Sequence, residues 1–251
     1  MKKKQPRIYI YGRNVVREAL MHAPHIIKTI YLSPQMADGK LMSLVHKSKI
    51  KTEKIDPKRV TSQVEGNAPH QGIIAHITLF GLMMPFEDFL KTIKQNEAQA
   101  FVYLDGVQDP HNVGTIIRAS AAFGASAVLM PQHNQSPVTP GVIKASAGAL
   151  FNIPLVSIEN PQQALAELRR RGITIYGMAG EGSSNINEEK FSGSSLFVMG
   201  NEGDGISPAT RPLCQKMLRI NISKSVESLN VASAATAALF AWSSKHPEAL
   251  K

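Results

Sequence analysis

The sequence predicts an α/β protein with a small N-terminal α/β domain and a larger domain whose mostly parallel sheet carries helices on both faces. Over the last three fifths of the chain, short apolar runs alternate regularly with polar loops and helical segments, which is typical of such a sheet. Residues 80–99 differ in character, because Gly81 and Pro85 interrupt the pattern. We therefore expect one domain at residues 1–79, a linker at 80–99 and a second domain at 100–251.

The N-terminal part combines short apolar runs with amphipathic segments. Strands are expected at Arg7–Ile10, Ile26–Leu32 and Gly72–Leu79, and helices at Asn14–His22 and Lys40–Ser48, with a further short helix at Phe86–Gln95 in the linker. Arg13 and Arg17 lie four residues apart on one helix face, a spacing that suits RNA phosphate contacts, and ordinary surface charge explains them almost as well. A structural turn explains His70 and Gln71 as well as a functional role does.

In the second domain, each short apolar run is expected to be a buried strand. Strands are expected at Phe101–Leu104, Ala127–Met130, Ile153–Val156, Ile173–Met178, Leu196–Met199 and Met217–Ile222. Helices are expected at Val113–Phe123, Val142–Leu150, Pro161–Arg171, Pro208–Lys216 and Val231–Trp242. Residues suited to capping these helices are Asn112, Gly124, Asn160 with Gly172, and Ser207.

The positive charge of the chain is concentrated in its first third. The formal net charge is +9, and residues 1–79 hold 14 Lys and Arg against 5 Asp and Glu, whereas residues 100–251 hold 12 against 11. A basic part beside a nearly neutral part indicates that one binds a polyanion such as RNA while the other handles a small ligand. A basic surface kept for solubility is the alternative.

Several classes of protein are disfavoured by composition. No apolar run reaches the roughly 18 residues needed to cross a bilayer. A single cysteine, Cys214, rules out an internal disulfide and makes the cytoplasm the expected compartment. No pattern of His, Cys or Asp predicts a metal site. The glycine fingerprints of dinucleotide and P-loop sites are missing, which argues against an oxidoreductase on a Rossmann sheet.

Two loops near the C-terminus carry the clearest functional signal. Each follows an apolar strand and is rich in Gly, Asn, Ser and Glu, and open α/β sheets bind ligands at the carboxyl ends of their strands. The loops contain Gly200-Asn-Glu-Gly-Asp-Gly205 and Ser228-Leu-Asn-Val231, and a third motif lies upstream in Leu104-Asp-Gly-Val-Gln-Asp-Pro-His-Asn-Val-Gly-Thr-Ile-Ile-Arg-Ala-Ser120. In this order and spacing, the three resemble the signature motifs of the SpoU (TrmH-like) 2′-O-ribose RNA methyltransferases.

The resemblance extends to the N-terminal part. Tyr11-Gly-Arg-Asn-Val-Val-Arg-Glu-Ala-Leu20 and His70-Gln-Gly-Ile73 are similar to the small RNA-binding domain of this family, which has a ribosomal-protein-like fold. Within the family, the chain is most similar to the branch that methylates a guanosine of large-subunit ribosomal RNA. The resemblance also implies a deep trefoil knot in the C-terminal domain, a feature that sequence physics would not propose.

The resemblance implies a methyl donor, S-adenosylmethionine, and a set of site residues. Donor contacts are expected from Met178, Gly200, Asn201, Ile220 and Leu229. The residues expected at the catalytic centre are Asn112, Arg118, Glu202, Ser228 and Asn230. No metal is expected. His111, beside Asn112, is explained by an exposed loop position rather than by acid–base chemistry.

Arg118 lies among apolar residues, where an arginine needs a specific partner, and Glu202 is the candidate; surface placement of both is the alternative. An arginine acting as general base would need its pKa lowered from above 12 to near neutrality, at about 1.36 kcal/mol per unit. We therefore expect Arg118 to act as a charged donor that positions RNA phosphate and stabilises a developing alkoxide.

The expected activity is 2′-O-methylation of a guanosine ribose in 23S ribosomal RNA. Methylation of a tRNA ribose is the alternative within the same class, and a catalytically silent RNA-binding or ribosome-assembly factor is the alternative outside it. The resemblance also implies a homodimer that places an arginine near the partner's site. The helix at residues 231–242 is apolar on nearly all sides and must be buried within one subunit or between two.

Overall fold

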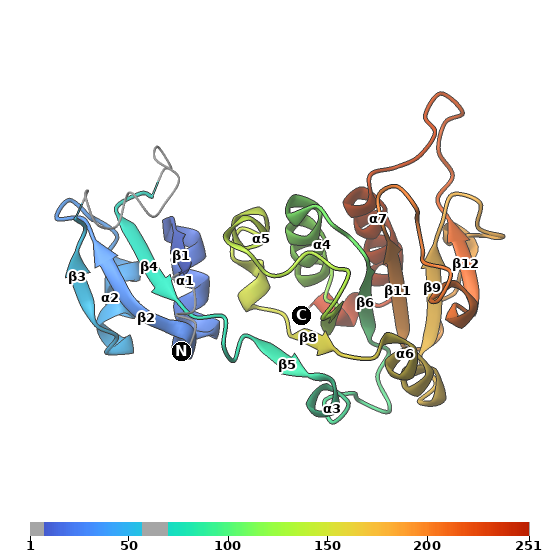
Figure 1. Ribbon diagram of the computed structural model, residues 1–251, viewed down its shortest axis with the longest axis horizontal. Helices are drawn as coiled ribbons and strands as arrows, with labels where there is room; N and C mark the ends of the chain where they lie inside the picture. Colours follow the sequence, from blue (N-terminus) through green and yellow to red (C-terminus); the bar gives the residue numbers. More distant parts are fainter. Residues whose placement is uncertain (1–7, 57–69, 251) are drawn as a thin grey trace.

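The computed structural model describes residues 8–56 and 70–250 as two sheets joined by one connection (Figure 1). Arg7, expected to open the first strand, lies outside the described residues. The N-terminal sheet has the strand order β1-β4-β2-β3, in which β4 runs antiparallel to β1 and β2 and β3 runs parallel to β2. Its elements are β1 Ile8–Tyr11, α1 Arg13–His22, η1 Pro24–Ile26, β2 Ile27–Leu32, α2 Gly39–Ser48, β3 Thr52–Lys54 and β4 Ile73–Ile77.

The C-terminal sheet has eight strands in the order β10-β12-β9-β11-β6-β7-β8-β5, and all neighbouring strands are parallel. The strands are β5 Met83–Pro85, β6 Ala100–Asp105, β7 Ala127–Pro131, β8 Leu155–Ile158, β9 Thr174–Met178, β10 Ser184–Asn185, β11 Ser195–Gly200 and β12 Lys216–Arg219. The helices are α3 Phe86–Phe89, α4 Pro110–Ala122, α5 Pro140–Ala145, α6 Pro161–Arg170 and α7 Val231–Ser243, with short 3₁₀ turns η3 Ala149–Phe151, η4 Ile186–Glu188, η5 Arg211–Leu213 and η6 Pro247–Leu250. The prediction of a mostly parallel sheet is confirmed.

Both faces of this sheet are covered, which explains why its central strands are continuous apolar runs. Along β6, Val102 and Leu104 belong to the core that includes α4 and α7, whereas Phe101 and Tyr103 belong to the core that includes α6. All four side chains are at most 1% exposed. Helices therefore lie on both faces, as expected.

Several helix ends follow the expected capping rules. The Asn160 side chain accepts a hydrogen bond from the Gln163 backbone N at 3.2 Å and begins α6. Gly124 and Gly172 follow α4 and α6 with φ values of 72° and 82°, which a residue with a Cβ rarely adopts. The cap expected at Asn112 is wrong, because Asp109 occupies that position and accepts from the His111 backbone N.

Four expected elements differ in the structure. The helix expected at 208–216 is wrong: only the η5 turn forms there, and β12 begins at Lys216 and ends at Arg219. The helix expected at 142–150 stops at Ala145, because positive φ angles at Ala147 and Gly148 break it. The segment expected as a linker contributes strand β5 to the sheet edge, and its helix is limited to the four residues of α3.

The two sheets are also connected by direct contacts away from the linker. Asn152 donates from Nδ2 to Glu18 Oε2 at 2.8 Å, and the Lys144 Nζ lies 5.9 Å from the centre of the Tyr11 ring. Gly148 packs so closely on α1 that an added Cβ would lie 3.1 Å from the Val15 Cα. The turn after α5 thus packs against the first helix of the N-terminal sheet.

Candidate functional site

Three of the expected donor-binding residues meet at one edge of the large sheet. Met178 ends β9, Gly200 ends β11, and Ile220 directly follows β12. Because β12, β9 and β11 are neighbouring parallel strands, their carboxyl ends share an edge. The structure therefore brings these three positions together, as the sequence predicts.

The loop after β11 is a compact turn held by Asn201. Asn201 and Gly205 exchange two backbone hydrogen bonds of 2.9 and 3.0 Å. The Asn201 Oδ1 accepts from the backbone N of Gly203 at 2.8 Å, and its Nδ2 donates to the Gly106 O at 2.8 Å. An added Cβ on Gly200 would lie 2.3 Å from the Gly205 carbonyl carbon. Gly200 and Asn201 therefore shape the loop and attach it to the neighbouring loop after β6.

Three of the expected catalytic residues form one hydrogen-bonded chain. Asn230 donates from Nδ2 to Asn112 Oδ1 at 2.9 Å, and Asn112 donates from its Nδ2 to Glu202 Oε1 at 2.9 Å. Asn112 is 5% exposed at the start of α4, and Asn230 caps α7 by accepting from the Ala232 N at 2.9 Å. We call Asn112, Glu202 and Asn230 the amide–carboxylate chain.

The surroundings of Glu202 keep its side chain ionised. Partial burial raises the pKa of Glu202, but hydrogen bonds from the Asn112 amide and from the backbone N of Gln108 and Asp109 outweigh this effect and hold the pKa below its usual range. Glu202 is therefore a fixed negative charge at neutral pH, with its oxygens occupied by donors.

Arg118 does not pair with Glu202, so the expected pairing is wrong. Arg118 follows Asn112 by six residues on α4, which turns it about 120° around the helix axis. Its side chain is exposed and forms no hydrogen bond or ion pair within residues 8–56 and 70–250. In a single chain, Arg118 therefore lies apart from the amide–carboxylate chain, on the surface.

The remaining expected residues lie in the loop between β12 and α7. Ser228 is exposed and Leu229 is 39% exposed, and Figure 1 shows this loop extending well beyond the sheet edge. The backbone of residues 220–222 forms no hydrogen bonds with the part of the chain that the structure describes. The loop thus combines unpaired backbone groups with accessible apolar side chains.

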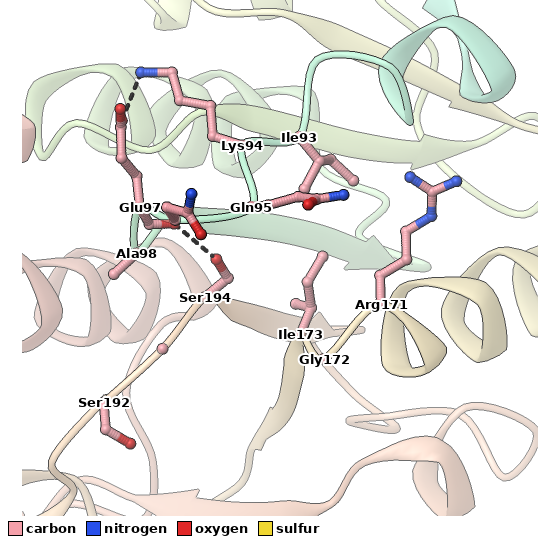
Figure 2. A pocket seen from close by; sticks show the side chains of 12 residues that line it. Ile93, Lys94, Gln95, Glu97, Ala98, Arg171, Gly172, Ile173, Ser192 and Ser194 are labelled. Carbon is pink, nitrogen blue, oxygen red and sulfur yellow. Dashed lines mark hydrogen bonds and ion pairs between the residues drawn. The ribbon is translucent and has the colours of Figure 1, made fainter.

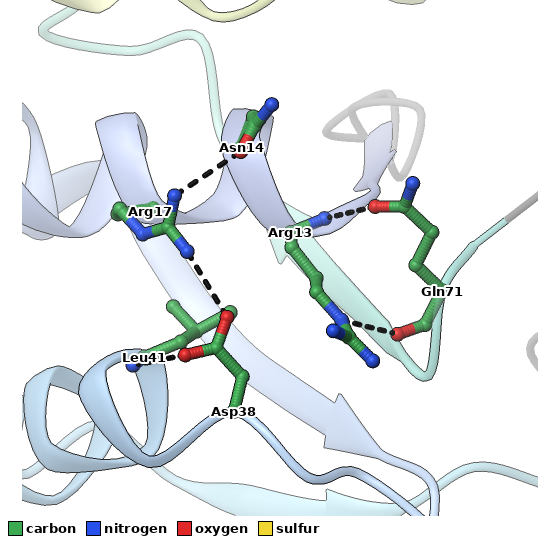
Figure 3. Close-up of polar contacts among 6 residues, drawn as sticks. All are labelled: Arg13, Asn14, Arg17, Asp38, Leu41 and Gln71. Atoms are coloured by element: carbon green, nitrogen blue, oxygen red, sulfur yellow. Dashed lines mark hydrogen bonds and ion pairs between the residues drawn. The ribbon is translucent and has the colours of Figure 1, made fainter.

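The two arginines expected to bind RNA make contacts within the N-terminal sheet domain (Figure 3). Arg17 donates to Asp38 Oδ2 at 3.0 Å and to Asn14 Oδ1 at 3.1 Å. Arg13 donates from its backbone N to Gln71 Oε1 at 2.9 Å and from Nε to the Gln71 O at 3.3 Å. The terminal guanidinium nitrogens of Arg13 have no partner among the described residues, so Arg13 remains the better placed of the two to contact phosphate.

The turn at His70 and Gln71 has a structural role. His70 Nδ1 accepts from the Gly72 backbone N at 3.1 Å, and the His70 O accepts from the Ile73 N at 3.0 Å. Gln71 and Gly72 both have positive φ angles, of 51° and 83°. This tight turn places the Gln71 side chain against the start of α1.

Asp105, at the end of β6, is a buried carboxylate that the sequence reasoning missed. It is 8% exposed and accepts from the Ser207 N at 2.7 Å and from Thr210 Oγ1 at 2.9 Å. Burial raises the pKa of Cys214 to about 11, and the Asp105 charge adds to this effect. The signal that could have found Asp105 is the strand-end position that located Gly200.

A cleft of about 570 Å³ lies at the opposite edge of the sheet (Figure 2). It lies at the amino ends of β6, β9 and β11, whereas ligands of open parallel sheets bind at carboxyl ends. Its two cations are already paired, Lys94 with Glu97 at 2.6 Å and Arg171 with Glu167 at 2.7 Å. This cleft is therefore not the candidate site.

Within the described residues, no group of three or more His, Cys, Asp or Glu side chains is arranged to hold a metal ion. Over the same residues, no helix is both long and apolar enough to span a membrane.

Comparison with known families decides the relationship that the motifs suggest. The model of the SpoU rRNA Methylase family matches residues 99–240, which is more than half of the chain and includes the amide–carboxylate chain. The chain belongs to the SpoU rRNA methylase family. A second model, described as RNA 2′-O ribose methyltransferase substrate binding, matches residues 9–81 of this SpoU protein.

Curated relatives and solved structures extend the SpoU comparison over nearly the whole chain. The 23S rRNA (guanosine-2′-O-)-methyltransferase RlmB of Pseudomonas putida is 33% identical over 237 residues, covering 92% of this chain and 94% of that protein. The RlmB protein of Vibrio vulnificus is 33% identical over 235 residues, with the same coverage.

Two solved structures have the same fold. The SpoU methyltransferase AviRb of Streptomyces viridochromogenes, solved with AdoMet, has a TM-score of 0.80 at 24% identity and covers 96% of this chain and 91% of its own. A putative RNA methyltransferase of the TrmH family from Porphyromonas gingivalis has a TM-score of 0.72 at 27% identity, covering 94% of this chain and 89% of its own.

Proposed function

We propose that this SpoU protein transfers a methyl group from S-adenosylmethionine to the 2′-hydroxyl of a guanosine ribose in 23S ribosomal RNA. The observation that carries the proposal is the amide–carboxylate chain, which joins three distant segments at the carboxyl edge of the sheet. The RlmB relatives of P. putida and V. vulnificus support the same substrate. We also propose a cytoplasmic location, where such RNA is made.

The donor fits the edge formed by β9, β11 and β12. Its adenine needs hydrogen-bonding partners along its edges and apolar contacts on its faces, and the unpaired backbone of residues 220–222 and the side chains of Met178 and Leu229 offer these. Because Gly200 has no Cβ, the backbone of Gly205 packs closely against it, beside this space. When bound, the donor supplies an electrophilic methyl group.

The amide–carboxylate chain has hydrogen-bonding capacity left for the RNA. Each asparagine amide carries two N–H groups, and Asn112 and Asn230 each use one of them in the chain. The remaining N–H groups can donate to oxygen atoms of the ribose or phosphate. Glu202 fixes the orientation of Asn112, and thereby the direction of its free N–H.

We further propose that residues 1–79 bind the RNA, that 80–99 connect the two parts and that 100–251 carry out methyl transfer. The excess of basic residues in the first part supports this division. We also propose a homodimer in which Arg118 of each subunit acts at the partner's site. Its exposure and its lack of partners among the described residues support this role, since an arginine stabilises developing negative charge without losing a proton.

The test uses the full chain, labelled S-adenosylmethionine and separate pools of 23S ribosomal RNA and tRNA. We expect label in 23S RNA, at the 2′-oxygen of a guanosine when the modified nucleoside is mapped. Leu229→Arg should abolish donor binding in calorimetry while leaving circular dichroism unchanged, because it fills the donor edge with a charged side chain. Label in tRNA alone would mean that tRNA, not 23S RNA, is the substrate. No label in either RNA would indicate a catalytically silent RNA-binding factor.

A further inference from the structure

A second cavity lies between the segment that leaves the N-terminal sheet and the end of β7 in the large sheet, and it is not part of the donor edge. It has a volume of about 270 Å³, below the roughly 300–1,000 Å³ of pockets for drug-sized ligands. One wall comes from Leu79, Leu82 and Met83, where the chain leaves the N-terminal sheet. The other comes from Met130 and the loop 131–138 after β7. We call this cavity the seam pocket.

The seam pocket combines an apolar lining with a few polar atoms. Leucine and methionine side chains line one wall, and Gln132 and Ser157 lie on the other. Gln132 donates from Nε2 to the Ser157 Oγ at 3.1 Å, and its Oε1 has no partner among the described residues. Neither residues 79–85 nor residues 131–138 contain an aspartate or glutamate. The pocket therefore offers apolar contact to a flat ring and an acceptor to its edge, without repelling a polyanion.

An exposed phenylalanine lies in the chain between two residues that line the seam pocket. Phe80 is 83% exposed, whereas Leu79 before it and Leu82 two residues after it line the cavity. It occupies the corner of a turn closed by a 3.1 Å hydrogen bond from the Leu82 N to the Leu79 O, in which Gly81 has a φ of 80°. The Gly81 O is also hydrogen-bonded to His25 Nε2 at 3.2 Å. The turn is thus fixed while the ring remains open to solvent.

The wall of the seam pocket formed by the 131–138 loop is hydrogen-bonded to the loop after β6, and that loop also binds the Glu202 carboxylate. The Gln135 side chain accepts from the Val107 N with Oε1 at 2.9 Å and donates from Nε2 to the Val107 O at 2.7 Å. Its amide thus pairs with the Val107 backbone as a neighbouring strand would. The neighbouring Gln108 donates from Nε2 to the Asn134 O and from its backbone N to Glu202. A ligand in the pocket therefore lies against the 131–138 loop, which is hydrogen-bonded to the loop that orients the amide–carboxylate chain.

We propose that the seam pocket, together with the Phe80 ring, binds one unpaired nucleobase of the RNA substrate. Aromatic rings on exposed, fixed positions are the usual stacking surfaces for single-stranded bases. The region that matches the RNA substrate-binding model ends at residue 81, between the lining residues Leu79 and Leu82. This inference rests on the proposed function, because it takes RNA as the substrate.

The test compares Phe80→Ala, Phe80→Tyr and Gln132→Ala in the full chain, with Leu250→Ala as the control for loss of an exposed apolar side chain elsewhere. We expect Phe80→Ala to weaken binding of 23S ribosomal RNA, and to raise its KM, about tenfold. Phe80→Tyr should restore both because it keeps the ring, and Gln132→Ala should weaken binding to a smaller extent. Donor affinity and thermal unfolding should not change in any of these variants.

Ultraviolet cross-linking of the wild-type protein to 23S RNA gives a readout that does not depend on methyl transfer. We expect cross-linked nucleotides on the peptides that contain Phe80 or residues 130–138. Cross-links confined to other peptides, or equal RNA affinities of wild-type and Phe80→Ala proteins, would overturn the inference. If cross-links form at the seam pocket but no label is transferred, the proposed activity fails while the base-binding pocket stands.

Discussion

At the scale of single residues, the hydrogen bonds around Glu202 determine what its carboxylate can do. Its oxygens accept from the Asn112 amide and from two backbone N–H groups, and its pKa is lowered. A carboxylate of lowered pKa is a weak proton acceptor, so we infer that Glu202 orients Asn112 rather than removing the ribose proton. The proton is then left to phosphate or water.

The pH dependence of stability follows from the direction of this pKa shift. Because the folded-state pKa of Glu202 lies below its ordinary value of 4.5, its contribution is fully present above about pH 4.5 and is lost as the pH falls through the lowered pKa. Glu202→Gln should therefore be less stable than the wild type at pH 7, with a difference that shrinks below pH 4.5. Urea unfolding of both proteins between pH 3 and 7 measures this. A difference that stays constant over that range contradicts the assignment.

The sequence motifs predicted which polar residues meet, but not how they are paired. Asn112, Glu202 and Asn230 converge because each lies at a strand or helix end on one edge of the sheet. Arg118 was matched with Glu202 because it lies among apolar residues and because the resemblance implies both at the catalytic centre, but the turn of α4 between residues 112 and 118 directs it elsewhere. Asp105 was overlooked because its strand-end position was not considered, and that position alone does not identify partners a hundred residues away.

At the scale of elements, the central strands were predicted well, whereas the short strands β3, β5 and β10 and the segment after β11 were not. Strands buried on both faces appear as continuous apolar runs, so the central strands were predicted to within about two residues. The Ser207–Pro208 pair resembles a helix start, but the Ser207 N and Oγ bind the Asp105 carboxylate instead. This long-range contact holds residues 207–210 in a turn, in which the Thr210 N donates to the Ser207 O.

The close packing around Gly200 gives a prediction for this loop. In Gly200→Ala, the new Cβ would lie 2.3 Å from a backbone carbon of Gly205, so the 201–205 turn must shift. We expect a loss of about 1–3 kcal/mol in unfolding free energy and a large loss of donor affinity. Gly203→Ala is the matched control, because its Cβ would meet only the Asn201 Oδ1 at 3.5 Å. Denaturant unfolding and calorimetry with the donor measure both effects, and equal behaviour of the two variants would disprove the packing argument.

At the scale of the whole molecule, the position of Arg118 bears on assembly. α7 packs against α4 within the chain, yet Phe240 is 60% exposed and its ring lies 6.0 Å from that of Phe123. These rings give an apolar surface near the helix that carries Arg118. Association of two chains through it would suit a site completed by the partner's arginine. The trefoil knot, which rests on resemblance, stays a prediction.

Subunit mixing tests the shared site. Arg118→Ala and Glu202→Ala chains should each be inactive when alone, and should regain about a quarter of wild-type activity when produced together, because random pairing leaves one intact site in half of the dimers. Sedimentation should give about twice the chain mass of 27.3 kDa. Each variant mixed with itself is the control. A fully active monomer would overturn the dimer, and dimers that never complement would indicate that each site is complete within one chain.

The amide–carboxylate chain also determines when, during synthesis, a new molecule becomes able to modify RNA. Its members are 90 and 118 residues apart along the sequence, and Asn230 caps α7, which is translated after the N-terminal sheet. N-terminal parts generally fold first during synthesis, so the basic N-terminal sheet can form while α7 is still being made. An unfinished chain would then be able to hold RNA without being able to modify it.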